Sequence, residues 1–433
     1  MEIRDPIHGF IPLSEWERDI INHPVFQRLR RIRQLAWTDM VYPGAMHTRF
    51  EHSLGVMHVA TRMFDHITTS RRKVLAELGF EDDGLKRQRI LIRLAALLHD
   101  VGHSPFSHAG EDLMPVNPET GKPFKHEEYS AQLIRLEMAD VIDNHLSNLR
   151  NHGITAAEVA DYIEGGPSLS SERLFWRELV TSQLDADRAD YLLRDSYHAG
   201  VRYGHYDLDR LVNSITLVDD PASGPRLAIE EGGWHAAEGL IWARYQMFTQ
   251  VYFHKTRVAF DHHIARAIAA LLAESQQGAP DQPADRFPPP TTRGGLKRYL
   301  EWTDWRALGM LEDGGGGEHG EILRTRQHHR LVYQTSEQPS LEDLERLEEV
   351  AEQLGPLLAH IGKAGSNWYK PEGEIMIAPE TAQGAAVVPL SHYSTAVAGL
   401  KRSDKRLLYA RVEDRKAADE IVAQTSMRTE GSR

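Results

Sequence analysis

The chain has 433 residues, enough for one large domain or two or three ordinary ones, and 41% of them are hydrophobic, as in a soluble globular protein. The net charge is −13 and no apolar stretch approaches the roughly 20 residues of a membrane span, so we expect a cytoplasmic protein without a membrane or a long nucleic acid as partner. The absence of cysteine excludes disulfides, thiolate catalysis and cysteine zinc sites, so any metal must be held by His, Asp or Glu.

Most of the chain is predicted to be helical. Residues 1–12 are expected to be extended with a turn at His8-Gly9, and a helix is expected from Ser14, which forms a capping box with Glu17. Further segments carry apolar residues at helical steps of three and four, or are apolar nearly all round. These segments are 23–35, 51–69, 85–99, 126–145, 156–163 and 236–274.

The C-terminal part has a different pattern. Gln, Pro, Gly and Asp dominate residues 275–290, which predicts a linker, and an acidic helix is expected over 341–354. Short β-like pieces follow at 374–378 and 406–412. We therefore expect a mainly α fold with a smaller C-terminal α+β region. The predicted divisions are a helical core over 1–275, a loop-rich linker over 276–320 and an α+β accessory region over 321–433.

Three segments carry a His/Asp constellation. His52 lies in RFEHSLG, the pair His99-Asp100 in LLHDVGHSPFSH, and Asp187 in LDADRADYLLRD. The pair follows an apolar helix, where an unpaired imidazole and carboxylate would be costly to bury unless a metal compensated them. Two imidazoles and two carboxylates suit Fe, Mn, Zn or Mg. The alternative is a hydrogen-bonded core histidine that Asp100 orients.

The strings PGAMHTRFEHSLG, LLHDVGHSPFSH, HEEYS and DADRADYLLRDSYHAG occur in this order, and the sequence resembles the HD-domain dNTP triphosphohydrolase (dNTPase) family. The resemblance covers residues 5–274 and is much weaker after about residue 290. It implies an all-helical HD-domain catalytic core that hydrolyses deoxynucleoside triphosphates to deoxynucleoside and inorganic triphosphate. It also implies a divalent metal ion, homo-oligomers and, in some members, a nucleotide activator bound between subunits.

The resemblance also assigns roles to single residues. The implied metal ligands are His52, His99, Asp100 and Asp187. The implied catalytic cluster is His103, His108, His126 and Glu127, with His108 acting at the α-phosphate. The implied phosphate contacts are Arg49, Arg188, Tyr191 and Arg244. The implied sugar contacts are Gln34 and Asp195 at the 3′-hydroxyl and Leu35 and Tyr252 at the 2′ position.

Alternatives remain for several of these residues. The family usually carries Lys where this chain has Arg188, which changes a point charge into a bidentate fork, and Arg188 is alternatively an ion pair with Asp185 or Asp190. Tyr252 is alternatively an aromatic core residue. The arginines of 23–35 either serve an interface or an effector phosphate, or form a solvated helix face.

The other histidines are given less weight. His47 is expected either behind the pocket or in its wall, and the pairs His262-His263 and His328-His329 are expected at the surface. Two other functions stay open for the chain. One is an HD-type phosphodiesterase or nuclease acting on cyclic nucleotides or oligonucleotides, and the other is a nucleotide-binding sensor without turnover.

Overall fold

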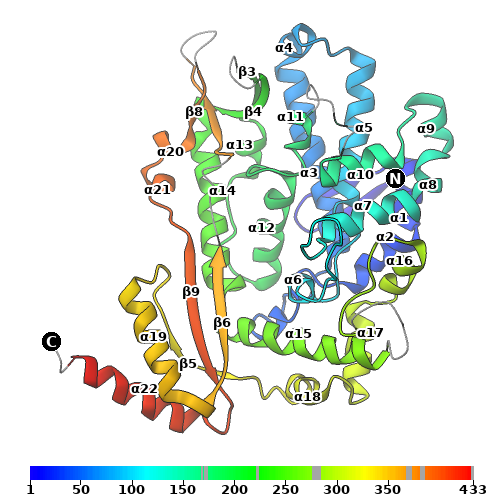
Figure 1. The fold of residues 1–433 in the computed structure, drawn as a ribbon. Helices are drawn as coiled ribbons and strands as arrows, with labels where there is room; N and C mark the ends of the chain where they lie inside the picture. The colour runs from blue at the N-terminus through cyan, green and yellow to red at the C-terminus, as the bar shows by residue number, and fades with distance from the viewer. Residues whose placement is uncertain are drawn as a thin grey trace.

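The computed structural model describes residues 1–166, 169, 174–220, 224–275, 284–366, 373–380 and 386–430. A large helical body carries two small sheets on its flank, and the C-terminal helices lie beside one of these sheets (Figure 1). The expected mainly α fold is confirmed, with its sheets concentrated toward the C-terminal part. Among the described residues, no helix is both long and apolar enough to cross a membrane.

The N-terminal segment follows its prediction up to residue 27. Strands β1 (Glu2–Asp5) and β2 (Gly9–Pro12) form an antiparallel hairpin, and helix α1 (Glu15–Asn22) begins with the expected capping box of Ser14 and Glu17. The single helix expected over 23–35 is wrong. The segment forms α2 (Pro24–Gln27) and the 3₁₀ turn η1 (Arg28–Arg31), after which the chain becomes extended.

Tertiary contacts explain this early end. The backbone N–H of Arg33 donates to the Asp304 carboxylate, and Arg33 pairs with Thr48 in a β-bridge. Arg28 turns inward, where its guanidinium donates to the carbonyls of His103 and Trp302. Local helix propensity is weak beside such buried contacts. Arg28 is therefore a core group rather than part of a solvated face.

The body is built around helix α3 (Arg49–Ser70), which packs on α5 (Asp82–Leu98) and α12 (Ala186–Ala199). The α5 helix is buried along its C-terminal half, as expected from its apolar sequence. Gly55 lets α3 approach α12, because a Cβ there would lie 1.9 Å from the Asp190 carboxylate. This close packing of the two helices brings His52 on α3 near Asp187 on α12.

Shorter helices complete the N-terminal body. The helix expected over 126–145 is interrupted, because the backbone N–H groups of Glu137 and Met138 both donate to the Leu133 carbonyl and close α7. The remaining elements are η2 (Thr38–Met40), α4 (Arg72–Glu77), α6 (His108–Glu111), α7 (His126–Leu136), α8 (Ala139–Asp143), α9 (Leu146–Asn151), α10 (Ala156–Glu164), α11 (Leu174–Arg177) and α13 (Leu208–Val212).

The long helix expected over 236–274 is also divided. Helix α14 (Trp234–Met247) passes into a π-helical turn, η5 (Phe248–Tyr252), and α15 (Lys255–Ser275) begins three residues later. π-Turns of this kind are frequent at functional sites. This turn carries Tyr252, whose predicted role is at the sugar.

Residues 284–320 differ from the loop-rich linker that was expected, and residues 276–283 lie outside the described residues. Helices α16 (Arg293–Leu300), α17 (Asp304–Glu312) and α18 (Gly317–Thr325) occupy this part of the chain. Leu296, Tyr299 and Trp302 are buried in the main core, so apolar burial overrides the Gly- and Pro-rich composition around them.

Two small sheets lie on the flank of the body. One has the order β3-β4-β7-β8, and the other has the order β5-β9-β6 and carries its own small apolar core beneath two helices. The strands are β3 (Ile215–Asp220), β4 (Gly224–Glu230), β5 (Arg330–Gln334), β6 (Leu358–Ser366), β7 (Met376–Ala378), β8 (Val388–Pro389) and β9 (Ser403–Ala410). The remaining helices are η4 (Glu231–Gly233), α19 (Leu341–Leu354), η6 (Gly355–Leu357), α20 (Leu390–Tyr393), α21 (Thr395–Ala398) and α22 (Arg415–Glu430).

Candidate active site

The four predicted metal ligands come from three helices and meet in space. His52 lies on α3, His99 caps the end of α5 with Asp100 next to it, and Asp187 lies on α12. Nε2 of His52 is 3.0 Å from Asp187 Oδ1 and 3.7 Å from Asp100 Oδ2. Nε2 of His99 is 3.3 Å from Asp100 Oδ1 and 3.8 Å from Asp187 Oδ1. Four donor groups therefore surround one point.

Hydrogen bonds within the protein hold the Nδ1 atoms of His52 and His99. Nδ1 of His52 lies 2.8 Å from Asp190 Oδ2, and Nδ1 of His99 lies 2.7 Å from the Ala96 carbonyl. Because a carboxylate and a carbonyl only accept, each Nδ1 donates, and Nε2 is the nitrogen left to face a metal. Both Nε2 atoms are buried without a hydrogen-bond partner. Orphaned buried nitrogens aimed at two carboxylates fit a divalent metal.

The charge balance at this centre also favours a cation. Burial lowers the pKa of His52, but the carboxylates of Asp187, Asp190 and Asp100 outweigh burial and raise it to about 10, so a metal at Nε2 would take the place of a proton that these carboxylates attract. Burial raises the pKa of Asp187, but His52 and His99 bring it down to about 2. The carboxylates are thus ionised at neutral pH and attract positive charge.

A second cluster of histidines lies beside the metal ligands and is organised by Glu111, which sequence reasoning missed. Glu111 Oε1 lies 2.6 Å from His126 Nδ1, and its Oε2 lies 2.9 Å from His108 Nδ1. The rings of His103 and His126 are stacked 3.8 Å apart, and Glu127 Oε2 is 3.5 Å from His126 Nδ1. The structure therefore brings the predicted catalytic residues together. The three-residue spacing of His108 and Glu111 on α6 was the available signal.

A strained turn presents His108. Phe106 and Ser107 both have φ near +55°, a conformation that non-glycine residues adopt at a cost of about 1–3 kcal/mol. The backbone N–H of Phe106 donates to Asp304, and the Ser107 hydroxyl accepts from Arg49 Nε at 3.0 Å. Surrounding contacts thus hold the turn that ends at His108.

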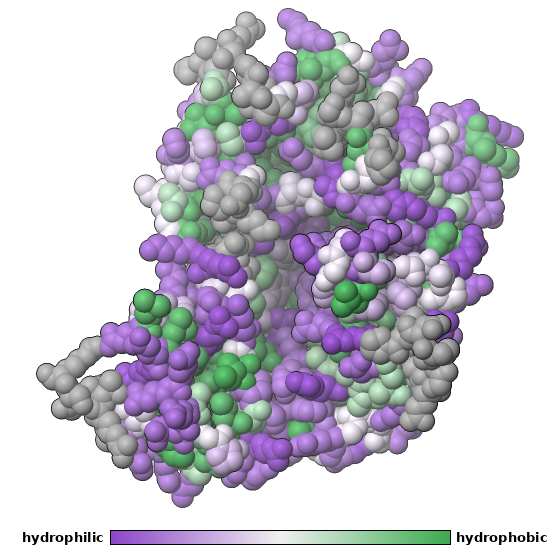
Figure 2. Space-filling model, in the orientation of Figure 1, coloured by the Kyte–Doolittle hydropathy of each residue, from purple (hydrophilic) through white to green (hydrophobic). Residues whose placement is uncertain are grey.

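A cavity of about 980 Å³ opens in front of these clusters. The face drawn in Figure 2 is hollowed near its centre, and hydrophilic residues border the hollow. Ten of the predicted site residues line the cavity: Gln34, Leu35, Arg49, His108, Asp187, Arg188, Tyr191, Asp195, Arg244 and Tyr252. The other six, His52, His99, Asp100, His103, His126 and Glu127, belong to the two clusters described above.

Basic side chains dominate part of the cavity wall. Arg188 donates to the Asp185 carboxylate, which is the ion pair considered as its alternative, and it lines the cavity at the same time. Burial lowers the pKa of Arg244 and outweighs the nearby Tyr191, which raises it. Four further cations line the cavity, and none of them was predicted from the sequence. They are Arg257, Arg266, Arg286 and Lys363.

Asp195 is the centre of a polar group at another part of the wall. Its Oδ1 lies 2.7 Å from His47 Nε2, and its Oδ2 accepts a 2.6 Å hydrogen bond from the Tyr252 hydroxyl. Gln34 presents a buried Oε1 without a hydrogen-bond partner. Burial raises the pKa of Tyr252 well above its ordinary value. The group is rigid and keeps a hydrogen-bonding amide available to a ligand.

The prediction that the two histidine pairs lie at the surface is wrong. His263, His328 and His329 are each less than a tenth exposed, and His262 is partly buried. Helix α15 places His262-His263 between the body and the β5-β9-β6 sheet, a contact between distant segments that local spacing does not reveal.

Comparison with known families agrees with this geometry. The HD domain model matches residues 49–195, which contain all four metal ligands, and the HD associated region model matches residues 206–282. The chain contains an HD domain followed by an HD associated region. Its HD domain spans α3 to α12, and the associated region spans α13 to α15 and so includes Arg244 and Tyr252.

Relatives of the HD-domain chain share this region. The uncharacterized protein YwfO of Bacillus subtilis is 37% identical over 254 residues, covering 58% of this chain and 51% of the relative. The deoxynucleoside triphosphate triphosphohydrolase SAMHD1 homolog of Dictyostelium discoideum is 31% identical over 268 residues, covering 61% of this chain and 48% of the relative. The chain thus spans about half the length of these relatives.

A solved structure extends the similarity beyond the HD domain. The crystal structure of a phosphohydrolase from Bacteroides thetaiotaomicron superposes with a TM-score of 0.69 at 28% identity. The match covers 95% of this chain and 99% of the other. The similarity therefore includes the C-terminal sheets as well as the helical body.

Proposed function

We propose that the protein is a metal-dependent dNTP triphosphohydrolase that releases a deoxynucleoside and inorganic triphosphate. The observation that carries the proposal is the single cavity that joins a metal-ligand cluster, several arginines and a polar group suited to a sugar. Its volume of about 980 Å³ is at the upper end for small-molecule sites, as a nucleoside triphosphate requires. The relatives named as dNTP triphosphohydrolases support the same substrate class.

The metal would be held by His52, His99, Asp100 and Asp187, and the identity of the ion, Mn, Fe, Mg or Zn, is left to experiment. A divalent ion bound there supplies Lewis-acid polarisation of a phosphoryl oxygen and a more acidic bound water. Arg49 donates to Asp100 and to Ser107, so it is fixed between the metal ligands and the turn before His108. Preorganised cations of this kind stabilise charge that spreads over a triphosphate.

His108 is the proposed proton-transfer group. Its side chain is 66% exposed and lines the cavity, while Glu111 holds its Nδ1 at 2.9 Å. Within the described residues its Nε2 has no hydrogen-bond partner and is open to a substrate or a water. Glu111 therefore orients the ring and favours a proton on Nδ1, which leaves Nε2 to exchange a proton at the reacting phosphate.

At the sugar, Gln34 and Asp195 are proposed to hold the 3′-hydroxyl, and Leu35 with Tyr252 to exclude a 2′-hydroxyl. Tyr252 is fixed by its bond to Asp195, so it cannot turn aside without breaking a buried hydrogen bond. A rigid wall of this kind discriminates by exclusion, since a ribose hydroxyl would meet an apolar or already paired group. Homo-oligomerisation and a nucleotide activator belong to the same proposal and rest on the family resemblance alone.

A product assay tests the proposal. The purified full chain is incubated with Mn²⁺ or Mg²⁺ and each dNTP, singly and mixed, and the products are separated by chromatography. Deoxynucleoside with intact triphosphate is the expected result, and turnover only in mixtures would indicate an activating nucleotide. No hydrolysis of any dNTP by the metal-loaded protein would contradict the proposal. Cyclic nucleotides and oligonucleotides would then be assayed next, and binding without any product would favour a sensor.

A further inference from the structure

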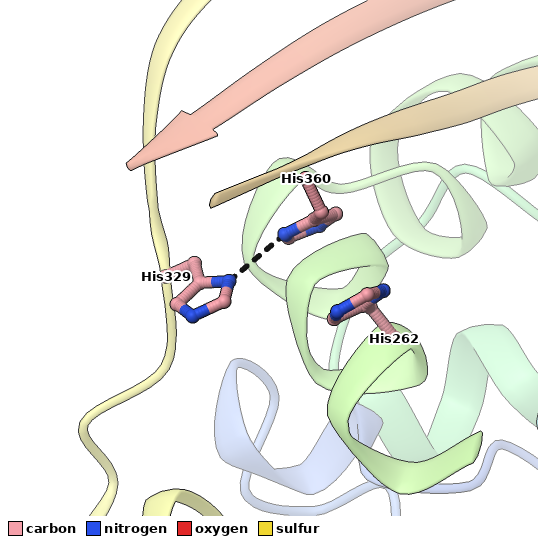
Figure 3. A group of neighbouring side chains, drawn as sticks. All are labelled: His262, His329 and His360. Carbon is pink, nitrogen blue, oxygen red and sulfur yellow. Dashed lines mark hydrogen bonds between the residues drawn. The ribbon is translucent and has the colours of Figure 1, made fainter. Parts of the chain in front are cut away.

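Five histidines from four separate segments gather at the base of the β5-β9-β6 sheet, outside the HD domain. His262 and His263 lie on α15, His319 on α18, His329 just before β5 and His360 on β6. Figure 3 shows three of them, with His329 facing His360 and the His262 ring close to the His360 ring. Sequence motifs gave no indication of this group, because up to 98 positions separate its members.

Three of these side chains, each from a different segment, form one possible set of metal ligands. His262, His329 and His360 each offer one ring nitrogen, and these nitrogens all lie within 4.8 Å of one another. Nδ1 of His329 is 2.9 Å from Nδ1 of His360, and the rings of His262 and His360 are stacked 3.9 Å apart. Zinc holds nitrogen ligands at about 2.0–2.1 Å and hence roughly 3.4 Å from one another, so side-chain shifts of about an ångström suffice.

The remaining two histidines support this set from behind. Nε2 of His263 accepts the backbone N–H of His329 at 3.2 Å, and its Nδ1 lies 2.8 Å from His319 Nδ1. One nitrogen of His263 is thus engaged with the backbone that carries His329. His263 therefore fixes the position of His329, in the way that second contacts orient metal-bound imidazoles.

The chemistry of the group suits a metal better than a set of charged side chains. Burial lowers the pKa of all five histidines, and nearby imidazoles or arginines lower it further. Nε2 of His360 is buried without a hydrogen-bond partner. Within the described residues, no Asp or Glu forms a salt bridge with any of the five rings. Imidazoles that converge without carboxylate partners are ligands for late first-row metals.

We propose that His262, His329 and His360 bind a second divalent transition metal, with zinc as the first candidate. The site would join α15 of the body to β6 and to the chain entering β5, and so clamp the C-terminal sheet onto the HD-associated region. Because His262 and His360 also line the 980 Å³ cavity, the clamp would fix part of the wall of that cavity. The proposal does not depend on the metal predicted at the HD motif.

A second cavity makes the site accessible. It has a volume of about 450 Å³ and is lined by His262, His319 and His329 together with charged side chains. Those charged residues are Arg266, Glu318, Arg411 and Asp414. The polar lining lets a hydrated ion reach the imidazoles, and a carboxylate or a water can complete the coordination of a three-histidine site.

The first experiment measures zinc stoichiometry in the full chain. An Asp187→Ala variant removes one predicted ligand of the HD site, and the metal that remains after dialysis is measured by mass spectrometry. We expect about one zinc per chain in Asp187→Ala, and a loss of that zinc when His329→Ala or His262→Ala is added. Zinc should also raise the Tm of Asp187→Ala but not that of the double variants.

The matched control is His328→Ala. His328 is the neighbour of His329 and equally buried, but its ring packs on Phe260 and contacts Arg330. It should keep the zinc of the Asp187→Ala background. X-ray absorption at the zinc edge of Asp187→Ala should report an imidazole-rich shell without a large carboxylate contribution.

The proposal is overturned if Asp187→Ala binds no zinc, or if the folded His329→Ala and His262→Ala variants keep it. It is equally overturned if His328→Ala loses zinc as completely as His329→Ala, because general disruption of the sheet would then explain both. If the HD motif binds no metal, wild type and Asp187→Ala should hold the same amount of zinc per chain. That result would contradict the proposed HD site but would leave the test of the histidine site intact.

Discussion

Asp190 decides how firmly His52 is held, and its replacement by asparagine is the sharpest test of the metal centre. The carboxylate is completely buried and has contacts on both oxygens. Oδ2 lies 2.8 Å from His52 Nδ1 and 2.8 Å from Arg194 Nε, while Oδ1 lies 2.6 Å from His8 Nε2 and 2.9 Å from Arg194 Nη2. An asparagine amide must turn its NH₂ toward one of these sides, and on either side it meets an Arg194 N–H.

The expected magnitudes follow from these contacts. Breaking a buried ion pair by removing one charge costs about 3–5 kcal/mol, and Asp5 would be the one ion-pair partner left to Arg194 among the described contacts. Loss of the group that orients a metal-bound histidine weakens metal affinity about 10–100-fold, equivalent to about 1.4–2.7 kcal/mol. Asp190→Asn should therefore lower both the free energy of unfolding and the affinity for the metal.

Calorimetric Mn²⁺ titration and urea unfolding of the same preparation measure the two effects. Asp209→Asn is the matched control, because Asp209 pairs with Arg62 at the surface and its side chain is 80% exposed. This control should change stability by only about 0–1 kcal/mol and leave metal affinity unchanged. A folded Asp190→Asn protein with wild-type Mn²⁺ affinity would refute the role of Asp190 in orienting His52.

Four further outcomes are expected. Asp100→Ala should abolish bound Mn²⁺ and dNTP hydrolysis together, and full turnover by the metal-free variant would contradict the mechanism. Tyr252→Ala should relax selectivity for deoxyribose, and kcat/KM values for dATP and ATP would show an unchanged ratio if the sugar assignment is wrong. Gly55→Ala should cost about 1–3 kcal/mol, because its Cβ would clash with the Asp190 carboxylate, and urea unfolding measures the loss. Burial raises the pKa of Asp304 to about 6, against backbone hydrogen bonds that lower it. The protonated Asp304 carboxyl therefore contributes stability that is present below the unfolded pKa near 4 and lost as the pH rises through about 6. The difference in unfolding free energy between wild type and Asp304→Asn should change across that pH range in urea melts. A constant difference would contradict the raised pKa of Asp304.

The helical body could be predicted largely because its core helices are apolar over many turns. Helices α3, α5 and α10 were expected within two or three residues of their observed bounds. The three motif segments also met as the resemblance implies, since they lie on or directly after α3, α5 and α12, which pack against one another. Long periodic segments report burial directly, and burial decides where such helices sit.

Elements shaped by tertiary contacts could not be predicted in the same way. The helix of residues 23–35 ends early because Asp304, some 270 positions away, takes the backbone N–H of Arg33. The same carboxylate holds the strained turn at Phe106 through its other oxygen. Asp304 itself lies within residues 276–320, which were predicted to be a loop-rich linker. One buried carboxylate thus explains a helix end and an active-site turn, and neither is visible in local sequence.

The same reasoning separates the two histidine groups of this protein. The ligands of the HD site lie in strings whose order and spacing carry information, so each motif supports the others on the amino-acid sequence alone. The cluster of His262, His329 and His360 has no such strings, and each of its members reads alone as an ordinary polar residue. Only the packing of α15 against the β5-β9-β6 sheet brings the rings together. A metal site built across two parts of a fold is therefore expected to escape motif reasoning, and the stoichiometry of bound zinc is the direct way to detect it.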